Sequence, residues 1–179
     1  MILEPFAPFS ATEFVIKFAT DPWEKQAAAA LRRQVFCHEQ GLFGNDDRDA
    51  VDEYAIALVA VSLVGVAADE VLGTVRIHET EPGVWWGSRL AVAADYRRVG
   101  ALGAGLIRLA VSSAHARGCT KFLANVQSQN ALMFSKLHCN ALSQHTIHGK
   151  PHHQMQADLA FYPPFEAPET GFHTLRKSA

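Results

Sequence analysis

The chain has 179 residues, of which 49% are hydrophobic and 19% are charged, and its formal net charge at pH 7 is −2. This length suits one domain that buries a core of its own. The nearly neutral charge gives no basic surplus to attract nucleic acid or an anionic membrane surface, and no apolar run approaches the roughly 20 residues of a membrane span.

The first residues, MILEPFAPFSATEF, contain acidic residues and prolines where a secretory signal has a basic end followed by an apolar stretch. The three cysteines, Cys37, Cys119 and Cys139, form no C-x-x-C pair. Both observations predict a cytoplasmic protein with reduced thiols.

The chain begins with a strand signal and a helix signal. Residues 13–19 (EFVIKFA) predict a strand, and the DPWE that follows is typical of a helix start, with Asp21 as the N-cap and Pro22 at the first helical position. This helix is expected to end near Gly41. The acidic loop GNDDRDAVDE at 44–53 comes next. We predict that it is a solvated face, which could also attract a cationic acceptor.

The remaining elements follow in chain order. Strands at 54–63, 71–79 and 84–92 precede a helix at 101–117, and a strand at 120–126, a short helix at 130–138 and two antiparallel strands joined at HGK, within 141–161, complete the order. The order β-α-β-β-β-α-β-α-β-β predicts an α+β fold, a mixed α/β sheet with helices on both faces. We expect residues 1–162 to form a single domain and residues 163–179 to form an irregular C-terminal tail.

The stretch DYRRVGALGAGLIRL at 95–109 joins the strand that ends at Val92 to the next helix. A helix N-terminus offers unpaired amides and a partial positive charge, glycines permit a close approach, and two arginines add donors that match phosphate geometry. The stretch therefore predicts a phosphate-binding turn, although a purely structural turn could have the same composition. Its G-x-x-G-x-G pattern matches neither the dinucleotide-binding pattern nor the P-loop, which disfavours both of those sites.

Five segments in the right order resemble GNAT-type N-acetyltransferases, over residues 13–161. They are LRRQVFCHEQG at 31–41, DRDAVDEYA at 47–55, VLGTVRI at 71–77, NVQSQNALMFSKLHCNAL at 125–142 and GKPHHQMQADL at 149–159. The likeness is to small GNAT proteins with VF-x-x-EQ and G-x-PH-x-x-M segments, and it extends to a subgroup associated with nitrogen-starvation gene clusters. The resemblance implies the GNAT acyl-CoA N-acyltransferase fold, with a central, mostly antiparallel sheet flanked by helices.

The resemblance also implies acetyl-CoA as the cosubstrate, without a metal. In the family, a [Q/R]-x-x-G-x-[G/A] loop binds the pyrophosphate through backbone amides, and this chain fits that loop in two registers, from Arg97 or from Arg98, which implies a one-residue insertion. The strand end RLAV would bind the pantetheine arm, and an amide of Leu90 or Val92 would polarise the acetyl carbonyl. The residues implied to bind acetyl-CoA are Leu90, Val92, Arg97, Arg98, Val99, Gly100, Ala101, Gly103, Ala104 and Asn130.

The implied reaction is direct attack of an amine on the thioester carbonyl, which needs a deprotonated amine and a stabilised oxyanion. Where the family often has a tyrosine as the acid, this chain has Phe134, so the thiolate could leave unprotonated. The candidate catalytic bases are Glu39 and His153, which the likeness brings to the acceptor cleft. A capping glutamate and a structural strand histidine are the simpler alternatives.

Other polar and aromatic side chains are less informative. The spacing of the late histidines differs from that of structural zinc sites, and the acidic loop lacks the final glutamate of an EF-hand. Trp85 and Trp86 are neighbours on a predicted strand and should face opposite sides, one toward the core and one toward the cleft or an interface.

These patterns predict an N-acetyltransferase that moves acetyl from acetyl-CoA to the amine of a small molecule. We expect no metal, no nucleic acid and no membrane as partners, and a homodimer is possible. Two alternatives stay open: a non-catalytic acyl-CoA-binding module, which Phe134 would suit, and an enzyme similar to acyl-homoserine-lactone synthases, which would prefer longer acyl chains. An NAD-dependent oxidoreductase has the least support.

Overall fold

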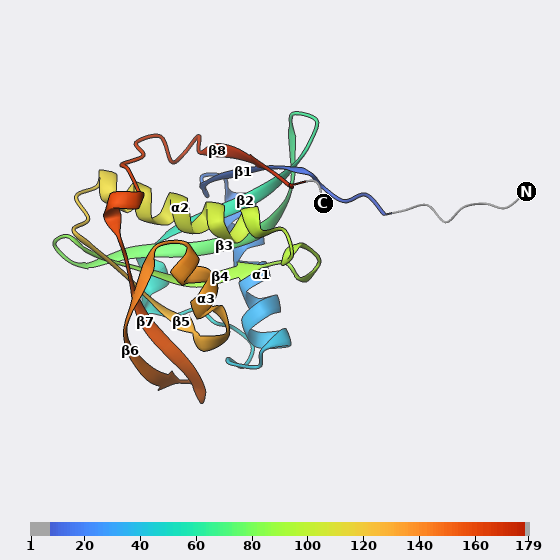
Figure 1. Ribbon diagram of the computed structural model, residues 1–179. Helices are drawn as coiled ribbons and strands as arrows, with labels where there is room; N and C mark the ends of the chain where they lie inside the picture. The colour runs from blue at the N-terminus through green and yellow to red at the C-terminus, as the bar shows by residue number, and fades with distance from the viewer. Residues whose placement is uncertain (1–7, 178–179) are drawn as a thin grey trace, which may run out of the picture.

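The computed structural model describes residues 8–177 as one eight-stranded sheet with helices on both of its faces (Figure 1). The strands are β1 (Glu13–Phe18), β2 (Ile56–Val64), β3 (Ala67–Glu81), β4 (Val84–Val92), β5 (Lys121–Gln127), β6 (Cys139–Ile147), β7 (Lys150–Ala157) and β8 (Phe172–Leu175). The α-helices are α1 (Pro22–Arg32), α2 (Gly100–Ala116) and α3 (Ala131–Lys136), and a π-helix (Arg33–Glu39) extends α1. Short 3-10 turns lie at Ala50–Glu53, Ala94–Tyr96, Ser128–Asn130 and Leu159–Phe161. None of the described helices is long and apolar enough to cross a membrane.

The strand order across the sheet is β6-β7-β5-β4-β3-β2-β1-β8. β4 and β5 run parallel because the crossover helix α2 joins them, and the other neighbouring pairs among residues 8–177 are antiparallel. This arrangement confirms the predicted mixed, mostly antiparallel sheet flanked by helices.

Different helices cover the two faces of the sheet. In Figure 1, α2 lies across the front of the strands and α1 lies behind them. Leu58 and Ala60 of β2 belong to the core beneath α2. Val59 and Val61 point the other way and pack with Ala28 of α1. β2 is therefore buried on both faces, which explains its continuous run of hydrophobic residues.

α2 packs closely on the sheet at Gly105. Leu102, Leu106 and Leu109 on the same helix are fully buried. A Cβ atom at Gly105 would lie 3.0 Å from Cγ1 of Ile16 on β1. The last glycine of the predicted phosphate-binding stretch therefore serves helix packing.

β4 and β5 pair along only part of their length. Residues 84–87 of β4 pair with residues 121–124 of β5, whereas the two strands continue to Val92 and Gln127. Beyond Gly87 the strands part, and the sheet opens between them.

A β-bulge bends β4 in this open region. The pairing of β4 with β3 shifts between Ser88 and Ala91, so Arg89 and Leu90 together face one residue of β3. Arg89 has a φ angle of 56°, in the left-handed region that few residues other than glycine adopt. A bulge interrupts the ladder of hydrogen bonds and increases the local twist, so β4 turns away from β5 here.

The predicted irregular tail is wrong near its end. Residues Phe172–Leu175 form β8, an edge strand that pairs antiparallel with β1. Phe172 packs against the main core, and this burial holds β8 in place. The prolines and the glycine that precede it in the sequence are typical of an irregular segment, so the strand was not predicted. Residues 1–7 and 178–179, at the outer ends of the predicted domain and tail, lie outside the described residues, and the single-domain assignment stays a prediction.

Gly171 controls the entry of the chain into β8. Its φ angle is 70°, and a Cβ atom there would lie 1.8 Å from the carbonyl oxygen of Ile16. We expect Gly171→Ala to lower the free energy of unfolding by more than the ~1–2 kcal/mol that the left-handed conformation alone costs an alanine. Gly149→Ala is the matched control, because Gly149 has a φ angle of 74° and a Cβ atom there would have no neighbour within 4 Å. Denaturant unfolding of both variants tests this, and equal losses would contradict the close packing of Gly171 on β1.

Candidate active site

A cavity of about 500 Å³ lies where β4 and β5 part. Ile107 and Val111 of α2 and Phe122 of β5 line one side of it. Arg76 and His78 of β3 line the other side. Their neighbours Val75 and Ile77 belong to the core beneath α2. Because side chains alternate along a strand, Arg76 and His78 point to the sheet face away from α2. The cavity therefore runs through the sheet from one face to the other. We call it the passage from here on.

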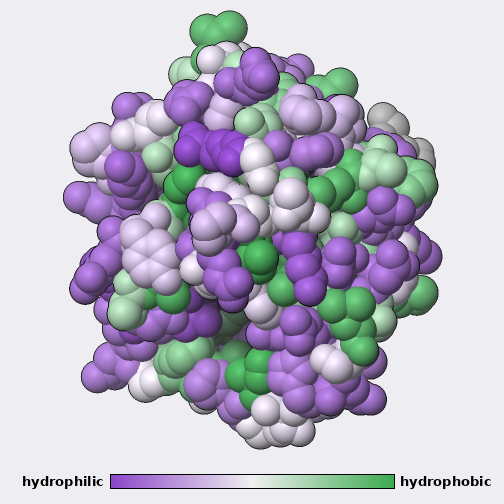
Figure 2. All heavy atoms as spheres, turned by 90° about the vertical axis from the view of Figure 1, so that its left-hand side faces the viewer, coloured by the Kyte–Doolittle hydropathy of each residue, from purple (hydrophilic) through white to green (hydrophobic). Residues whose placement is uncertain are grey.

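Apolar and aromatic side chains make up most of the lining of the passage. The outer surface is different: the face in Figure 2 is largely hydrophilic, and hydrophobic atoms lie at the floor of a shadowed hollow in its lower half. Trp85 is buried in the main core and Trp86 lines the passage. This confirms that the two tryptophans face opposite sides, one of them toward the core.

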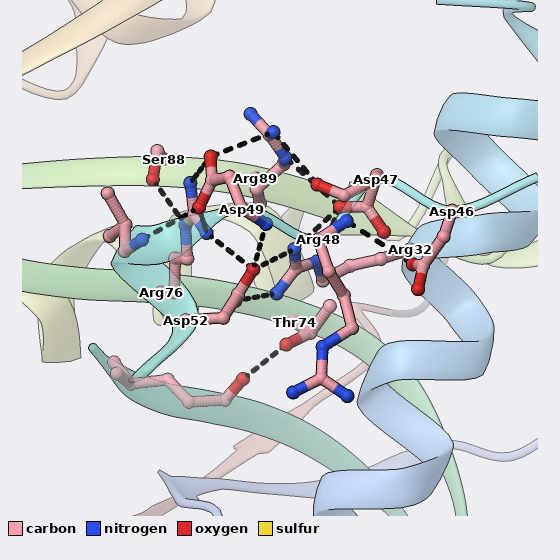
Figure 3. Close-up of polar contacts among 12 residues, drawn as sticks. Arg32, Asp46, Asp47, Arg48, Asp49, Asp52, Thr74, Arg76, Ser88 and Arg89 are labelled. Atoms are coloured by element: carbon pink, nitrogen blue, oxygen red, sulfur yellow. Dashed lines mark hydrogen bonds and ion pairs between the residues drawn. The ribbon is translucent and has the colours of Figure 1, made fainter. Parts of the chain in front are cut away.

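The acidic loop joins six side chains into an ion-pair network (Figure 3). We call this the loop network, and its members are Arg32 of α1, Asp47, Asp49 and Asp52 of the loop, Arg76 of β3 and Arg89 of β4.

Each aspartate of the loop network binds at least two arginines. Asp47 accepts hydrogen bonds from Nε of Arg32 at 2.7 Å and from Nε of Arg89 at 3.0 Å. Asp49 accepts two hydrogen bonds from Arg76, at 2.6 and 2.9 Å. Asp52 accepts two from Arg32, at 2.6 and 3.1 Å, and forms an ion pair with Arg76 at 2.8 Å. The network therefore connects α1, the loop, β3 and the bulge of β4.

Most residues of the acidic loop are exposed, as the predicted solvated face requires, but the prediction is wrong for two of its aspartates. The side chain of Asp47 is 1% exposed and that of Asp52 is 12% exposed. The hydrogen bonds from Arg76 hold the pKa of Asp49 below its ordinary value. Burial alone would raise the pKa of Asp52, but hydrogen bonds from Arg32 and from the amide of Asp49 hold it well below its ordinary value. Among residues 8–177, no group of three or more His, Cys, Asp or Glu side chains is arranged to hold a metal ion.

Arg89 extends the loop network to the rim of the passage. Its guanidinium carbon lies 4.5 Å from the centre of the Phe43 ring, a distance typical of cation–π contacts. The Phe43 ring meets the ring of His148 edge-on, with 4.9 Å between their centres. His148 belongs to the turn between β6 and β7, so this chain of contacts joins the acidic loop to the opposite side of the passage.

α2 begins at Gly100, after the N-cap residue Val99. The first amides of a helix have no acceptor within the helix, and here they belong to Gly100 and Ala101. A Cβ atom at Gly100 would have no atom within 4 Å. Arg98 is exposed beside this helix start.

Arg97 is already engaged. Its Nε donates a hydrogen bond to the carbonyl oxygen of Val92 at 3.1 Å, and its guanidinium pairs with the carboxylate of Glu39. The pair connects the end of the π-helix to the turn before α2.

The predicted acetyl-CoA residues fall into two groups. Leu90 and Asn130 line the passage, whereas Val92, Arg97, Arg98, Val99, Gly100, Ala101, Gly103 and Ala104 lie on the last residue of β4, the turn and the first part of α2. Their roles in binding stay predictions.

The two predicted bases lie outside the lining of the passage as the described residues define it. Glu39 is held by Arg97. On β7, His152 lines the passage and His153 does not, which is the alternation expected of neighbours on a strand. Nδ1 of His152 lies 2.9 Å from the carbonyl oxygen of Lys150. Because a carbonyl oxygen only accepts, Nδ1 carries the proton. Phe134 lines the passage, so an apolar ring occupies the place expected of a tyrosine acid.

His78 is a candidate that the sequence analysis did not single out. It lines the passage, and its Nδ1 is buried with no hydrogen-bond partner among residues 8–177. Burial lowers its pKa below the ordinary value, and the positive charge of Arg76 lowers it further. The imidazole is therefore neutral near pH 7 and has a free lone pair. In the sequence, His78 lies two residues after Arg76, a spacing that places both side chains on the same face of strand β3. This spacing is the signal that could have identified it.

Cys139 also lines the passage. Burial raises the pKa of its thiol to about 11, so the thiolate that would act as a nucleophile is scarce near pH 7. The thiol lies 3.8 Å from the carbonyl oxygen of Leu137, to which it donates.

Comparisons with known proteins agree on the fold. A model of the acetyltransferase (GNAT) family matches residues 20–134. A comparison of the sequence with curated proteins finds no match. Among solved structures, a candidate N-acetyltransferase of Lactobacillus plantarum is similar with a TM-score of 0.71 and 22% identity, and the match covers 80% of this chain and 97% of the other.

Two further solved structures are similar at lower identity. An aminoglycoside 6'-N-acetyltransferase in complex with coenzyme A has a TM-score of 0.65 and 17% identity, with 79% of this chain and 95% of the other covered. The AHL synthase LasI has a TM-score of 0.65 and 13% identity, with 86% and 96% covered. At these identities the likenesses show the fold alone.

The loop network should make stability depend on acid. The pKa of Asp52 is lower in the folded chain than in the unfolded one, so its contribution is present above the unfolded pKa of about 3.9 and is lost as the pH falls below it. We expect Asp52→Asn to lower the free energy of unfolding at pH 7 by about 3–5 kcal/mol, because it breaks a largely buried ion pair, and to differ less from the wild type near pH 3.

The matched control is Asp69→Asn, at an exposed position of β3, which should change stability by about 0.5 kcal/mol or less. Denaturant unfolding at both pH values gives the comparison. Similar stabilities of Asp52→Asn and the wild type at pH 7 would show that the network does not support the fold.

Proposed function

This chain belongs to the acetyltransferase (GNAT) family, and on that premise we propose that it transfers an acyl group, as in acetyl-CoA, from a CoA thioester to the amine of a small molecule. The observation that carries the proposal is the passage between β4 and β5, because it connects a polar side, a bulged strand and an apolar interior lined by the middle of α2. The subgroup of the family and the identity of the amine belong to this proposal as well.

The pyrophosphate of CoA would bind at the start of α2. The amides of Gly100 and Ala101 and the partial positive charge of the helix N-terminus favour an anion there. Arg98 is exposed and can add a charged donor, whereas Arg97 is held by Glu39. This distribution supports the register of the loop that begins at Arg98.

The thioester carbonyl would bind at the bulge of β4. The bulge interrupts the ladder at Arg89 and Leu90, and an amide released from a ladder can donate to a developing oxyanion. Leu90 lines the passage and Val92 does not. We therefore assign the oxyanion contact to Leu90 and leave Val92 to hold Arg97 through its carbonyl oxygen.

The amine would attack the thioester directly. An acyl-enzyme on Cys139 is disfavoured because burial keeps that thiol protonated. The CoA thiol has an ordinary pKa near 8.5, so it can leave as a thiolate beside the apolar Phe134. A cytoplasmic location fits this chemistry and the three free, buried cysteines.

The amine must lose a proton before it attacks. Of the three candidate bases, His78 lines the passage and has a buried ring nitrogen without a hydrogen-bond partner among the described residues, while Glu39 is paired with Arg97 and His153 lies outside the lining. A neutral imidazole can accept the proton directly or through one water molecule. We therefore propose His78 as the base and Glu39 as the residue that positions Arg97.

A first prediction concerns the CoA site. Gly100→Asp should weaken acetyl-CoA binding about 10- to 100-fold, because its carboxylate repels phosphate and displaces charge-assisted hydrogen bonds worth about 1.5–3 kcal/mol each. An acidic residue in the first turn of a helix does not harm folding, and the position has open space. Calorimetric titration gives the Kd. The control is Gly44→Asp, also at a position with open space. Unchanged affinity of Gly100→Asp would place the CoA pyrophosphate elsewhere, and no binding by the wild type would end the proposed function.

A second prediction concerns the base. In an assay of CoA release with acetyl-CoA and a panel of small amines, His78→Ala should lower kcat by about 10²- to 10⁴-fold and leave the Kd of acetyl-CoA unchanged. Because the pKa of His78 is lowered, wild-type kcat should fall only below the ordinary histidine range near pH 6.5. Glu39→Gln provides the comparison. A large loss of kcat in Glu39→Gln with full activity in His78→Ala would assign the base to Glu39.

A further inference from the structure

An indole ring lies beside the proposed base. Trp86 on β4 pairs directly with His78 on β3. Directly paired residues point to the same face of a sheet, with their Cβ atoms ~5 Å apart. Both residues line the passage and both are half-buried, so part of each side chain stays accessible. Among residues 8–177, no aromatic ring or guanidinium packs on the indole of Trp86. The accessible part of this ring can therefore bind another molecule.

Other aromatic side chains lie on the same side of the passage. The ring of Tyr54 meets the ring of His78 edge-on, with 5.8 Å between their centres. Phe43 is half-buried, lines the passage and lies against Arg89. Arg89 and Arg76 share the carboxylate of Asp49, which places Phe43 near the face that carries His78. An amine that gives its proton to His78 would therefore have its carbon skeleton beside aromatic rings.

The lining offers no anionic partner to a substrate with several ammonium groups. Among the described residues that line the passage, none is an aspartate or a glutamate. The lining includes Arg76 and Arg89 instead, and the loop network to which they belong has three arginines and three aspartates, so its charges cancel. A charge that leaves water without a partner is costly. A single ammonium group can be held by the face of an aromatic ring, and tryptophan is the best such ring. The lining therefore favours one ammonium group over several.

We propose that the acceptor is a primary monoamine whose amino group is joined to an aromatic ring by a short alkyl chain, and that Trp86 selects it. This inference rests on the proposed acyl transfer and names the class of its acceptor. A ring that stacks on the indole lies ~5 Å from it. His78 is on the neighbouring strand at a similar distance, so an amine about two carbons away from the ring can reach the imidazole.

The test is a calorimetric titration of matched amines into the protein saturated with CoA, which has no acyl group to transfer. Phenethylamine should bind at least about tenfold more tightly than butylamine, because its ring is buried and stacked. Cyclohexylethylamine has a similar size without an aromatic face, and it should bind about 2- to 10-fold more weakly than phenethylamine. Putrescine, the diamine with the carbon chain of butylamine, should bind at least about tenfold more weakly than butylamine.

The outcomes that contradict the inference differ from those that contradict the proposed function. Tighter binding of putrescine than of butylamine, equal binding of phenethylamine and cyclohexylethylamine, or no binding of any amine would overturn the inference. The proposed function would still stand in each case as long as acetyl-CoA binds. Failure of both CoA and acetyl-CoA to bind would instead remove the proposed function.

Two variants test the role of Trp86. Trp86→Leu should weaken phenethylamine binding at least about 20-fold and butylamine binding less than about fivefold, with the Kd of acetyl-CoA unchanged as evidence of folding. Trp86→Phe keeps an aromatic face and should retain most of the affinity for phenethylamine. The matched control is Trp23→Leu, at an exposed position of α1 outside the lining, which should leave the series unchanged. Full phenethylamine binding by Trp86→Leu would overturn the inference.

Discussion

The buried carboxylate of Asp47 is the constraint on which the site depends. Taking a charge out of water is costly, and the cost is offset only if good partners meet it in the interior. Arg32 at the end of α1 and Arg89 in the bulge of β4 are those partners. Their positions fix how the acidic loop lies against the sheet. The ion pairs that Arg89 forms with Asp47 and Asp49 also hold its left-handed backbone conformation, because its guanidinium must reach both carboxylates.

The passage follows from the bulge that this network holds. β4 and β5 pair only over residues 84–87 and 121–124, and the bulge turns β4 away just beyond that point. The sheet opens there, while α2 and the β6–β7 hairpin keep the two sides together. The same arginine that holds the bulge lies against Phe43 at the rim. One set of contacts therefore shapes the strand, the opening and its mouth.

The sequence predicts the fold well because local signals agree with it. β4 falls on the predicted residues 84–92, since a turn and an apolar run bound it, and α2 begins one residue before its predicted start. The site is harder to predict because it depends on contacts that are distant in the chain. Asp49 and its partner Arg76 are 27 residues apart, so the acidic loop gives no sign in the sequence of the ion pairs that its aspartates form. On β7 a one-residue difference exchanges faces, which separates His152 from His153.

The sheet divides the passage into two chemical environments, an apolar one beneath α2 and a polar one on the opposite face, and this division bears on where the two substrates of the proposed reaction would bind. Beneath α2 the walls are apolar and buried. On the opposite face Arg76, His78 and Ser88 provide charge, a neutral base and a hydroxyl. Arg76 is already compensated by Asp49 and Asp52, so it lowers the pKa of His78 without drawing an anion into the site. In the proposed reaction the donor thioester and the acceptor amine would meet at the bulge, where Leu90 lines the passage.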